Sequence, residues 1–210
     1  MHGETWTEGD GNGGASYSFS GGIGCMKRVY GKILLWSKLH IFPCLLFFLL
    51  CVPVRAGVLQ DRQQALEPLF NAPCARYQVP KVLALAIARQ ESGCHPWILN
   101  ISGRDVRPRS KEDALRYARW AMRAGRSFDV GVMQVNSYWI KKYDWPLELV
   151  LEPANNVKIG VWILAQEIRR HGLNWKAVAY YHTPLHRNPE RGRQYAQLVL
   201  GHVKKILAEK

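Results

Sequence analysis

The most restrictive feature of this 210-residue chain is a segment that is apolar on almost every side and ends in a carboxylate. Residues 80–93 begin with proline, which is favoured in the first turn of a helix, and end at glycine, a common stop. The apolar side chains between them are Val82, Leu83, Leu85, Ala86 and Ile87. A helix with such a surface must be buried, so the segment predicts a central helix of a globular core.

Further segments predict helices that pack around this one. Residues 110–125 open with a capping box and continue with apolar side chains at helical spacing. A helix capped by Asn155 or Asn156 is predicted to end at Gly172, because its apolar residues fall on one face. The remaining helical segments are residues 175–181 and 195–207.

Strand-like alternation is scarce along the chain, and no internal repeat is visible. The predicted fold class is therefore mainly α. Residues 126–152 break the helical pattern with turn signals such as Trp145-Pro146, so we expect this stretch to line a cleft.

The N-terminal part divides into two segments that precede the predicted domain. Residues 1–25 are rich in Gly and Ser, which predicts a disordered extension upstream of a true start at Met26. Residues 26–56 combine a basic start, an apolar run and small side chains up to Ala56, which is typical of a cleaved signal peptide. Residues 57–210 are then the exported, periplasmic domain. The alternative is a retained membrane anchor, although the apolar run is shorter than the ~20 residues that a spanning helix needs.

Two of the five cysteines, Cys74 and Cys94, lie after residue 56. An even number of cysteines in an exported chain predicts one disulfide bond between them. A structural zinc site needs four ligands, more than these two and His95 supply, so neither a metal nor another cofactor is expected.

Charge narrows the class of partner without deciding it. The chain has 29 Lys and Arg against 16 Asp and Glu, a net charge of +13. Nucleic acid, acidic cell-wall polymer or anionic lipid would each suit such a surface, as would simple solubility. Export argues against nucleic acid. The arginines of the predicted helix over 110–125 and just beyond it, which could contact wall polymer, are Arg116, Arg119, Arg123 and Arg126.

Glu91 is the candidate catalytic residue, because it lies at the end of the most apolar helix. Loss of hydration raises the pKa of a carboxyl group, and a carboxyl that stays protonated near neutral pH can protonate a glycosidic oxygen. The alternative is a structural glutamate paired with Arg89 or another arginine.

Four motifs in order resemble the family 1 lytic transglycosylases, whose fold is lysozyme-like and shared with goose-type lysozymes. Glu-Ser-Gly at 91–93 resembles the family's Glu-Ser motif, and Gly-Val-Met-Gln at 131–134, preceded by Asp129, resembles its Gly-Leu-Met-Gln. The next helix matches at Pro153, Asn156, Gly160 and Leu164, and Ala-Tyr-Tyr-His at 179–182 stands where Ala-Tyr-Asn is usual. The resemblance covers about residues 65–200 and is nearest to the small transglycosylases of conjugation and type IV secretion systems.

The resemblance implies a role for each matching residue. Glu91 is the acid and base. Ser92 and Gln134 are polar groups beside the reacting sugar, Met133 packs under it, and Tyr181 hydrogen-bonds near the catalytic carboxyl. His182 stands where asparagine is usual and is counted with Ser92, Met133, Gln134 and Tyr181 as a substrate-binding residue. Thr183-Pro184 follow it in place of a small residue and glycine, so the motif does not determine the shape of this loop. The alternatives are core packing for Met133 and Tyr181 and a loop-satisfying amide for Gln134, while Asn136 is interpreted as structural.

The resemblance further implies a lyase that cleaves the β-1,4 bond between N-acetylmuramic acid and N-acetylglucosamine and leaves 1,6-anhydro ends. It needs no second carboxylate, whereas a hydrolase does, with Asp129, Asp144, Glu148 and Glu152 as candidates. The expected partners are peptidoglycan glycan strands and proteins of a conjugation or secretion apparatus, for which the enzyme would open the cell wall locally. The rival interpretations are a lysozyme-type hydrolase and a non-catalytic glycan-binding assembly component.

Overall fold

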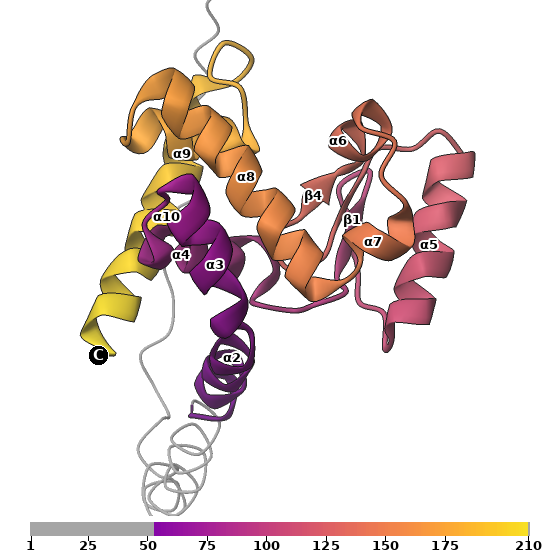
Figure 1. The fold of residues 1–210 in the computed structure, drawn as a ribbon, viewed down its shortest axis with the longest axis horizontal. Coiled ribbons are helices and arrows are strands. Elements are labelled where there is room, and N and C mark those ends of the chain that lie inside the picture. The colour runs from indigo at the N-terminus through magenta and orange to yellow at the C-terminus, as the bar shows by residue number, and fades with distance from the viewer. Residues whose placement is uncertain (1–52, 210) are drawn as a thin grey trace, which may run out of the picture. The chain divides into compact units, whose positions relative to one another are not determined.

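The computed structural model describes residues 53–209, which form a helical part and a small sheet (Figure 1). The helices are α2 (Pro53–Leu66), α3 (Pro68–Tyr77), α4 (Lys81–Ser92), α5 (Lys111–Arg123), α6 (Ser137–Lys142), α7 (Leu147–Val150), α8 (Pro153–His171), α9 (Trp175–His182) and α10 (Pro189–Ala208). The strands are β1 (Leu99–Ile101), β2 (Arg104–Val106), β3 (Phe128–Val130) and β4 (Val135–Asn136). The predicted extension 1–25 and all but the last four residues of the predicted signal segment 26–56 lie outside the described residues.

The helical part is built around α4, as its apolar sequence predicts. Every side chain from Ala84 to Arg89 is buried, and α10 packs along the helix while α3 contacts it from another side (Figure 1). The core that surrounds α4 also receives side chains from α8 and α9, including Val161, Leu164 and Val178. The prediction of a buried central helix is confirmed.

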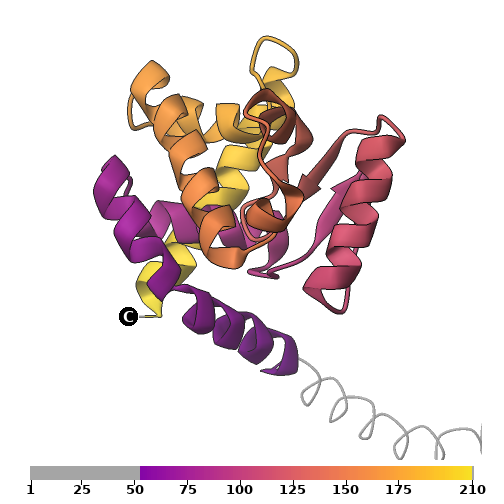
Figure 2. The ribbon, with the colours of Figure 1, turned by 45° about the vertical axis from the view of Figure 1, so that its right-hand side comes forward.

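The sheet was not predicted. Its strands run antiparallel in the order β2-β1-β3-β4 and contain two or three residues each, too few for an alternating pattern to stand out in the sequence. In β1 and β3 the first and third residues are buried and the middle one is partly exposed. α5 covers the apolar face with Ala114, Ala118 and Ala121, so that the sheet lies between α5 and the helical part (Figure 2).

The opposite face of the sheet carries a row of polar residues. The strand register places Asp105, Asn100, Asp129 and Asn136 side by side across the four strands. Two hydrogen bonds join neighbours in this row, from Asn100 Nδ2 to Asp105 Oδ1 at 2.8 Å and from Asn136 Nδ2 to Asp129 Oδ1 at 2.6 Å. Asn136 also caps α6 by accepting from the Tyr138 backbone N–H, which agrees with its structural interpretation.

The helix over 110–125 is confirmed as α5, and Ser110 caps it by accepting from the Asp113 backbone N–H at 3.2 Å. The predicted start of α8 was wrong: the helix begins at Pro153 after Glu152. Proline in the first turn lacks an N–H that would otherwise have no partner, which favours this earlier start. Asn156 therefore lies inside the helix, fully buried, and does not cap it.

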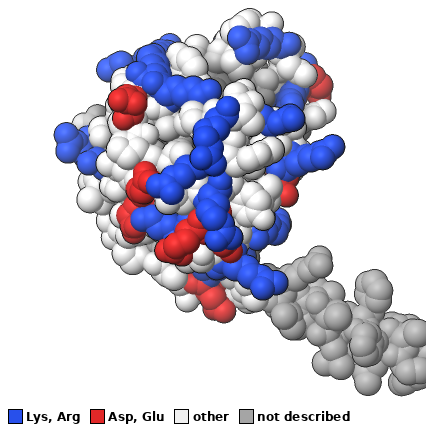
Figure 3. All heavy atoms as spheres, turned by 90° about the vertical axis from the view of Figure 1, so that its right-hand side faces the viewer, with Lys and Arg blue, Asp and Glu red and all other residues white. Residues whose placement is uncertain are grey.

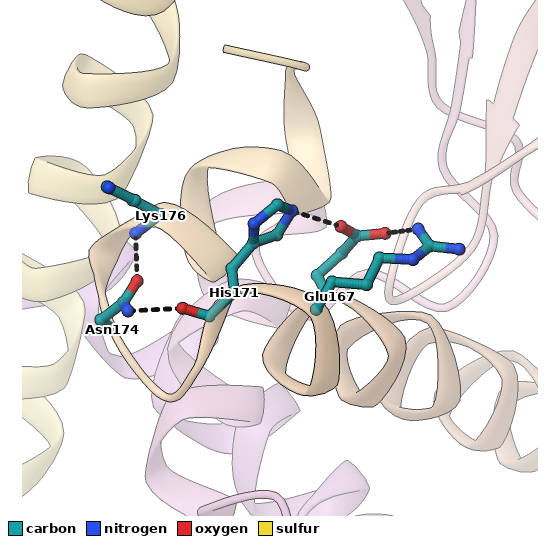
Figure 4. Close-up of polar contacts among 5 residues, drawn as sticks. Glu167, His171, Asn174 and Lys176 are labelled. Atoms are coloured by element: carbon teal, nitrogen blue, oxygen red, sulfur yellow. Dashed lines mark hydrogen bonds and ion pairs between the residues drawn. The ribbon is translucent and has the colours of Figure 1, made fainter.

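The corner between α8 and α9 is held by polar contacts at the end of α8 (Figure 4). Glu167 pairs with Arg170 at 2.8 Å and lies 3.5 Å from His171. Asn174 donates to the His171 carbonyl at 2.6 Å and caps α9 by accepting from the Lys176 backbone N–H at 2.9 Å. These contacts fix the direction in which α9 leaves the corner toward His182.

Cys74 and Cys94 are both buried in the helical core, and both are free thiols in the structure. The predicted disulfide bond between them is therefore absent, and the even number of cysteines was a misleading guide. Burial raises the pKa of each thiol to about 11, so apolar packing keeps both sulfurs in the protonated form, which does not start disulfide exchange.

None of the helices among residues 53–209 combines the length and the apolar character that crossing a membrane requires.

Candidate active site

Glu91 is the second-last residue of α4, where the helix leaves the core. Its side chain is partly buried and lines a cavity of about 680 Å³. Burial is the main cause that raises its pKa from 4.5 to about 7. A hydrogen bond from Tyr195 acts in the opposite direction, and the nearby carboxyl of Asp129 adds to the rise. The carboxyl can therefore hold a proton near neutral pH and also release it.

Glu91 has no cationic partner among the described residues, although Arg89 lies two residues before it. The Arg89 guanidinium points elsewhere. It forms two hydrogen bonds with Glu209, at 3.1 and 2.5 Å, and its Nε donates to Gln63 Oε1. The alternative in which Arg89 neutralises Glu91 is therefore wrong.

The hydroxyl that holds Glu91 belongs to Tyr195 of α10, which donates to Oε1 at 2.5 Å. Tyr195 falls at the start of the predicted helix 195–207, and nothing in the local sequence marks its hydroxyl as part of a site. Tyr181 was expected near the carboxyl. It lies close enough for the Glu91 charge to raise its pKa, although burial is the larger cause, but its hydroxyl donates to the Met133 carbonyl at 2.8 Å.

His182 supports Tyr195 from behind. The two rings stack with centroids 4.5 Å apart and an angle of 18° between their planes. Burial, and secondarily the charge of Arg191, lowers the pKa of His182, so the imidazole is neutral at pH 7. His182 thus packs against the tyrosine that holds Glu91, and its Nδ1 lies 2.6 Å from Thr183 Oγ1.

The turn 131–134 lies against the end of α4 and is fixed from two sides. From α4, the buried Ser92 hydroxyl donates to the Val132 carbonyl at 2.8 Å. From α8, the buried Asn156 amide accepts from the Met133 backbone N–H at 2.8 Å and donates to the carbonyls of Val130 and Val150. Ser92 and Asn156 therefore hold the turn in place, and the predicted contact of Ser92 with a sugar stays a prediction.

Two glycines permit this close packing. Gly131 has a positive φ of 81°, and a side chain there would overlap the Asn156 amide. Gly160 of α8 faces Met133, whose Cβ and Cγ would overlap any side chain at that position. Met133 is fully buried between the turn and α8, in agreement with the core-packing alternative, so it can support a bound sugar only from inside.

Gln134 ends the turn with a positive φ of 45°. Its side-chain Nε2 donates to the carbonyls of Ile98 and Gly131, at 3.0 and 2.9 Å. The amide nitrogen therefore satisfies the loop, as the alternative interpretation holds. Since both hydrogens of Nε2 are used, only the amide oxygen of Gln134 is left to face a ligand.

The cavity next to Glu91 is enclosed by three parts of the chain. The end of α4 supplies residues 90–93, the strand region supplies Ile98, Asp105 and Arg107, and α2 supplies Val58, Leu59 and Arg62. Asp144, Glu148 and Glu152 do not line this cavity, and the last two pair with Arg119 and Lys111. Asp129 is the one of the four candidate carboxylates whose charge acts on Glu91.

Among the described residues, no three histidine, cysteine or acidic side chains come together in a way that could hold a metal ion. The chemistry available to the arrangement is that of a carboxyl group poised between its two protonation states beside a cavity of the size of a sugar unit or two.

The family model "Transglycosylase SLT domain" matches residues 68–198, which include every element from α3 to α9 and the first half of α10. The chain belongs to the transglycosylase SLT family. The expected family and the mainly α, lysozyme-like fold class are thereby confirmed, and the matched segment contains Glu91, the turn 131–134 and Tyr195. α2 lies outside it.

Among curated proteins, the chain is similar to the "Type IV secretion system protein virB1" of Brucella abortus, Brucella melitensis and Brucella suis. Each is 35% identical over 99 residues, which is 46% of this chain and 41% of the relative. The matched region is thus less than half the length of these relatives. No solved structure matches the chain.

Proposed function

We propose that this protein is a lytic transglycosylase that cleaves peptidoglycan glycan strands at the β-1,4 bond between N-acetylmuramic acid and N-acetylglucosamine. The observation that carries the proposal is Glu91, which is desolvated, has no cationic partner in the described structure and has a pKa raised to about 7. Such a group is suited to general acid and base catalysis at the same pH. Membership of the transglycosylase SLT family supports this substrate and reaction.

We infer different tasks for the two carboxyl oxygens of Glu91. Because Tyr195 donates to Oε1, that oxygen acts as an acceptor, and the catalytic proton resides on Oε2. Oε2 gives its proton to the glycosidic oxygen as the bond breaks. The N-acetyl group of the muramic acid supports the developing cation, the 6-hydroxyl of the same sugar attacks C1, and its proton returns to Glu91. The product has a 1,6-anhydro end, and no water is consumed.

A lysozyme-type hydrolase is the second candidate, and Asp129 is the observation that favours it. Its carboxyl lies near Glu91, burial raises its pKa, and an inverting or retaining hydrolase requires a second carboxylate. However, Asp129 Oδ1 accepts a hydrogen bond from Asn136 in the polar row of the sheet, which favours a positioning role.

Mass spectrometry of the muropeptides released from purified murein tests the proposal. The transglycosylase leaves 1,6-anhydro ends, whereas a hydrolase leaves reducing ends that are heavier by one water. Glu91→Gln serves as the matched control, since it keeps the shape of the side chain without its acid. Retained cleavage by Glu91→Gln would contradict the proposal, and binding without any cleavage by the wild-type protein would favour a non-catalytic assembly component.

We further propose that the protein acts in the periplasm and opens the wall locally for a type IV secretion or conjugation apparatus. The similarity to the virB1 proteins supports this setting, and the predicted signal segment 26–56 would supply the export route. In this proposal, residues 57–210 are the processed catalytic domain. Deletion of the gene should lower secretion or conjugation frequency, and a copy that encodes Glu91→Gln should fail to restore it.

The basic face that carries α5 supports a contact with anionic wall polymer. Lys and Arg side chains are spread across this side of the molecule (Figure 3). Arg116 and Arg119 are paired with Asp113 and Glu148, whereas Arg123 and Arg126 are exposed and have no ion pair among the described residues. Sedimentation with peptidoglycan should therefore weaken as salt is raised.

A further inference from the structure

The cavity next to Glu91 has one wall that lies before the family match. This wall is α2, whose residues Val58, Leu59 and Arg62 line the cavity. The helix is mostly exposed and is held through its inner face, where Leu59 packs on the helical core and the buried Gln63 accepts from Arg89. Arg89 is in turn fixed by Glu209. The rotation of α2 is thereby set, and with it the position of Arg62 next to Gln63.

Another part of the cavity lining comes from β2 and the residue that follows it. Val106 turns toward the core under the sheet, so its neighbours Asp105 and Arg107 turn to the other side, where both line the cavity. The Asp105 carboxylate accepts a hydrogen bond from Asn100 within the polar row of the sheet. Arg107 extends beyond that row into the cavity.

Neither Arg62 nor Arg107 forms an ion pair with any of residues 53–209. The two guanidinium groups act on one place. His95, just after α4, has a lowered pKa because it is buried and because Arg62 and Arg107 both lie near it. Two cationic groups, one from α2 and one from the end of β2, therefore line the same cavity as the catalytic carboxyl, and neither is in a salt bridge within the described structure. The other carboxylate of the lining, Asp105, is bonded to Asn100.

We propose that Arg62 and Arg107 form a carboxylate-binding subsite that recognises an acidic group of the substrate next to the bond that Glu91 cleaves. The inference rests on the proposed function, which supplies the substrate class. Peptidoglycan offers such groups on every muramic acid, either as the free lactyl carboxylate or as the carboxylates of the stem peptide. Guanidinium groups suit this ligand because their N–H groups pair with both oxygens of a carboxylate.

The subsite includes a residue of α2, a helix that lies outside the segment matched by the family model. Glu91, the turn 131–134 and Arg107 lie within residues 68–198, whereas Arg62 does not. Selection for an acidic substrate over a neutral N-acetylglucosamine polymer is thus shared between α2 and the matched domain.

The test compares Arg62→Gln and Arg107→Gln with the wild-type protein on matched substrates. These are glycan strands with stem peptides, strands stripped by an amidase so that lactyl carboxylates are free, and both kinds after conversion of their carboxyl groups to methylamides. We expect each variant to lower kcat/KM about tenfold on the acidic strands and to equal the wild type on the methylamide strands. A loss confined to peptide-bearing strands identifies the stem peptide as the ligand, and a loss confined to stripped strands identifies the lactyl group.

Arg169→Gln is the matched control, because it removes the same charge from an exposed arginine of α8 that does not line the cavity. Thermal unfolding of each variant separates loss of folding from loss of recognition. An equal loss on acidic and methylamide strands, or an equal loss in Arg169→Gln, would overturn the proposal.

The same comparison is made by equilibrium binding of soluble murein fragments in a Glu91→Gln background, where no turnover is needed. If the wild-type protein cleaves nothing, the proposed function fails, yet binding still decides the subsite. Weaker binding of acidic fragments by Arg62→Gln, with unchanged binding of methylamide fragments, supports it. Equal affinities of Arg62→Gln and its parent for the acidic fragments contradict it.

Discussion

The last turn of α4 carries two ionisable side chains, Arg89 and Glu91, that are two residues apart and are treated in opposite ways. Arg89 is 6% exposed and is satisfied by Glu209 and Gln63, so its charge is compensated inside the protein. Glu91 accepts a hydrogen bond from the Tyr195 hydroxyl and has no counter-ion among the described residues. The same helix end thus ties α2, α4 and α10 together on one face and exposes an uncompensated acid to the cavity on the other.

This difference shows how an ionisable residue that supports the fold can be distinguished from one that is suited to catalysis. Moving a charged group out of water is unfavourable unless an opposite charge or hydrogen bonds replace the lost hydration. A buried carboxyl group without such a partner has a raised pKa and stays protonated. Arg89 is bonded to Glu209 and Gln63, which join α10 and α2 to α4. Glu91 has its pKa moved to about 7, which weakens the fold at alkaline pH but makes the group useful for proton transfer.

The sharpest way to break the comparison is Glu91→Gln, from which we expect a loss of murein cleavage of 10²-fold to 10⁴-fold or more. Its effect on stability should have the opposite sign. Because the folded-state pKa lies above the ordinary value, ionisation of Glu91 destabilises the protein increasingly from pH 4.5 up to about 7. The variant should therefore unfold at higher urea than the wild type at pH 8, and at nearly the same urea at pH 4. A less stable variant at pH 8 would mean that Glu91 is a structural group.

Arg89→Met tests the other side of the pair. The methionine fills much of the space, but Gln63 loses its buried donor and Glu209 its partner, so we expect a loss of roughly 2 kcal/mol in the free energy of unfolding. Activity per folded molecule should change far less than in Glu91→Gln. Urea denaturation followed by far-UV circular dichroism measures the free energy of unfolding. Murein cleavage, assayed about 20 °C below the unfolding transition, measures the activity per folded molecule. Unchanged stability would show that the Arg89 network contributes nothing.

Tyr195→Phe sharpens the comparison, because it removes the hydroxyl that donates a hydrogen bond to Glu91. The hydrogen bond from Tyr195 lowers the pKa of Glu91, so its loss should raise that pKa above about 7. Activity needs the protonated acid and falls as pH rises through the pKa, so the alkaline limb of the pH–rate profile should move to higher pH. A roughly tenfold lower rate at the optimum is expected because the carboxyl is no longer held in place. A limb that moves to lower pH would contradict this assignment.

Asp129→Asn should have the smallest effect, in the opposite direction. Its charge raises the pKa of Glu91 as the last of three causes, so the neutral amide should move the alkaline limb slightly to lower pH. The amide oxygen can still accept from Asn136, which preserves the row across the sheet. The products also matter: an unchanged yield of anhydro ends fits a positioning role, whereas abolished cleavage would identify Asp129 as the second carboxylate of a hydrolase.

The sequence predicted what depends on local pattern or on a family motif. The burial of α4, the rise in the pKa of Glu91 and the capping of α5 all follow from residues within a few positions of one another. The partner of Glu91 could not be predicted in this way, since Tyr195 lies 104 residues further along the chain.

The missed elements have physical reasons of the same kind. Strands of two or three residues are set by pairing with distant segments, and the polar row becomes visible only once their register is known. Asn156 was assigned to a helix start because asparagine is a good cap, but a buried amide that joins three backbone groups serves the adjoining turn. The cysteines were paired by number alone, and the contribution of α2 to the cavity had no sequence signal.

The contact between Gly160 and Met133 determines how far α8 can approach the turn 131–134. One added methyl group there would displace Met133, and with it the backbone carbonyls of the turn that Ser92 and Tyr181 hold. Because Ser92 is the neighbour of Glu91, the position of the catalytic residue depends on a glycine on the far side of the turn. Variation at position 160 would thus disturb the end of α4 without changing any residue that lines the cavity.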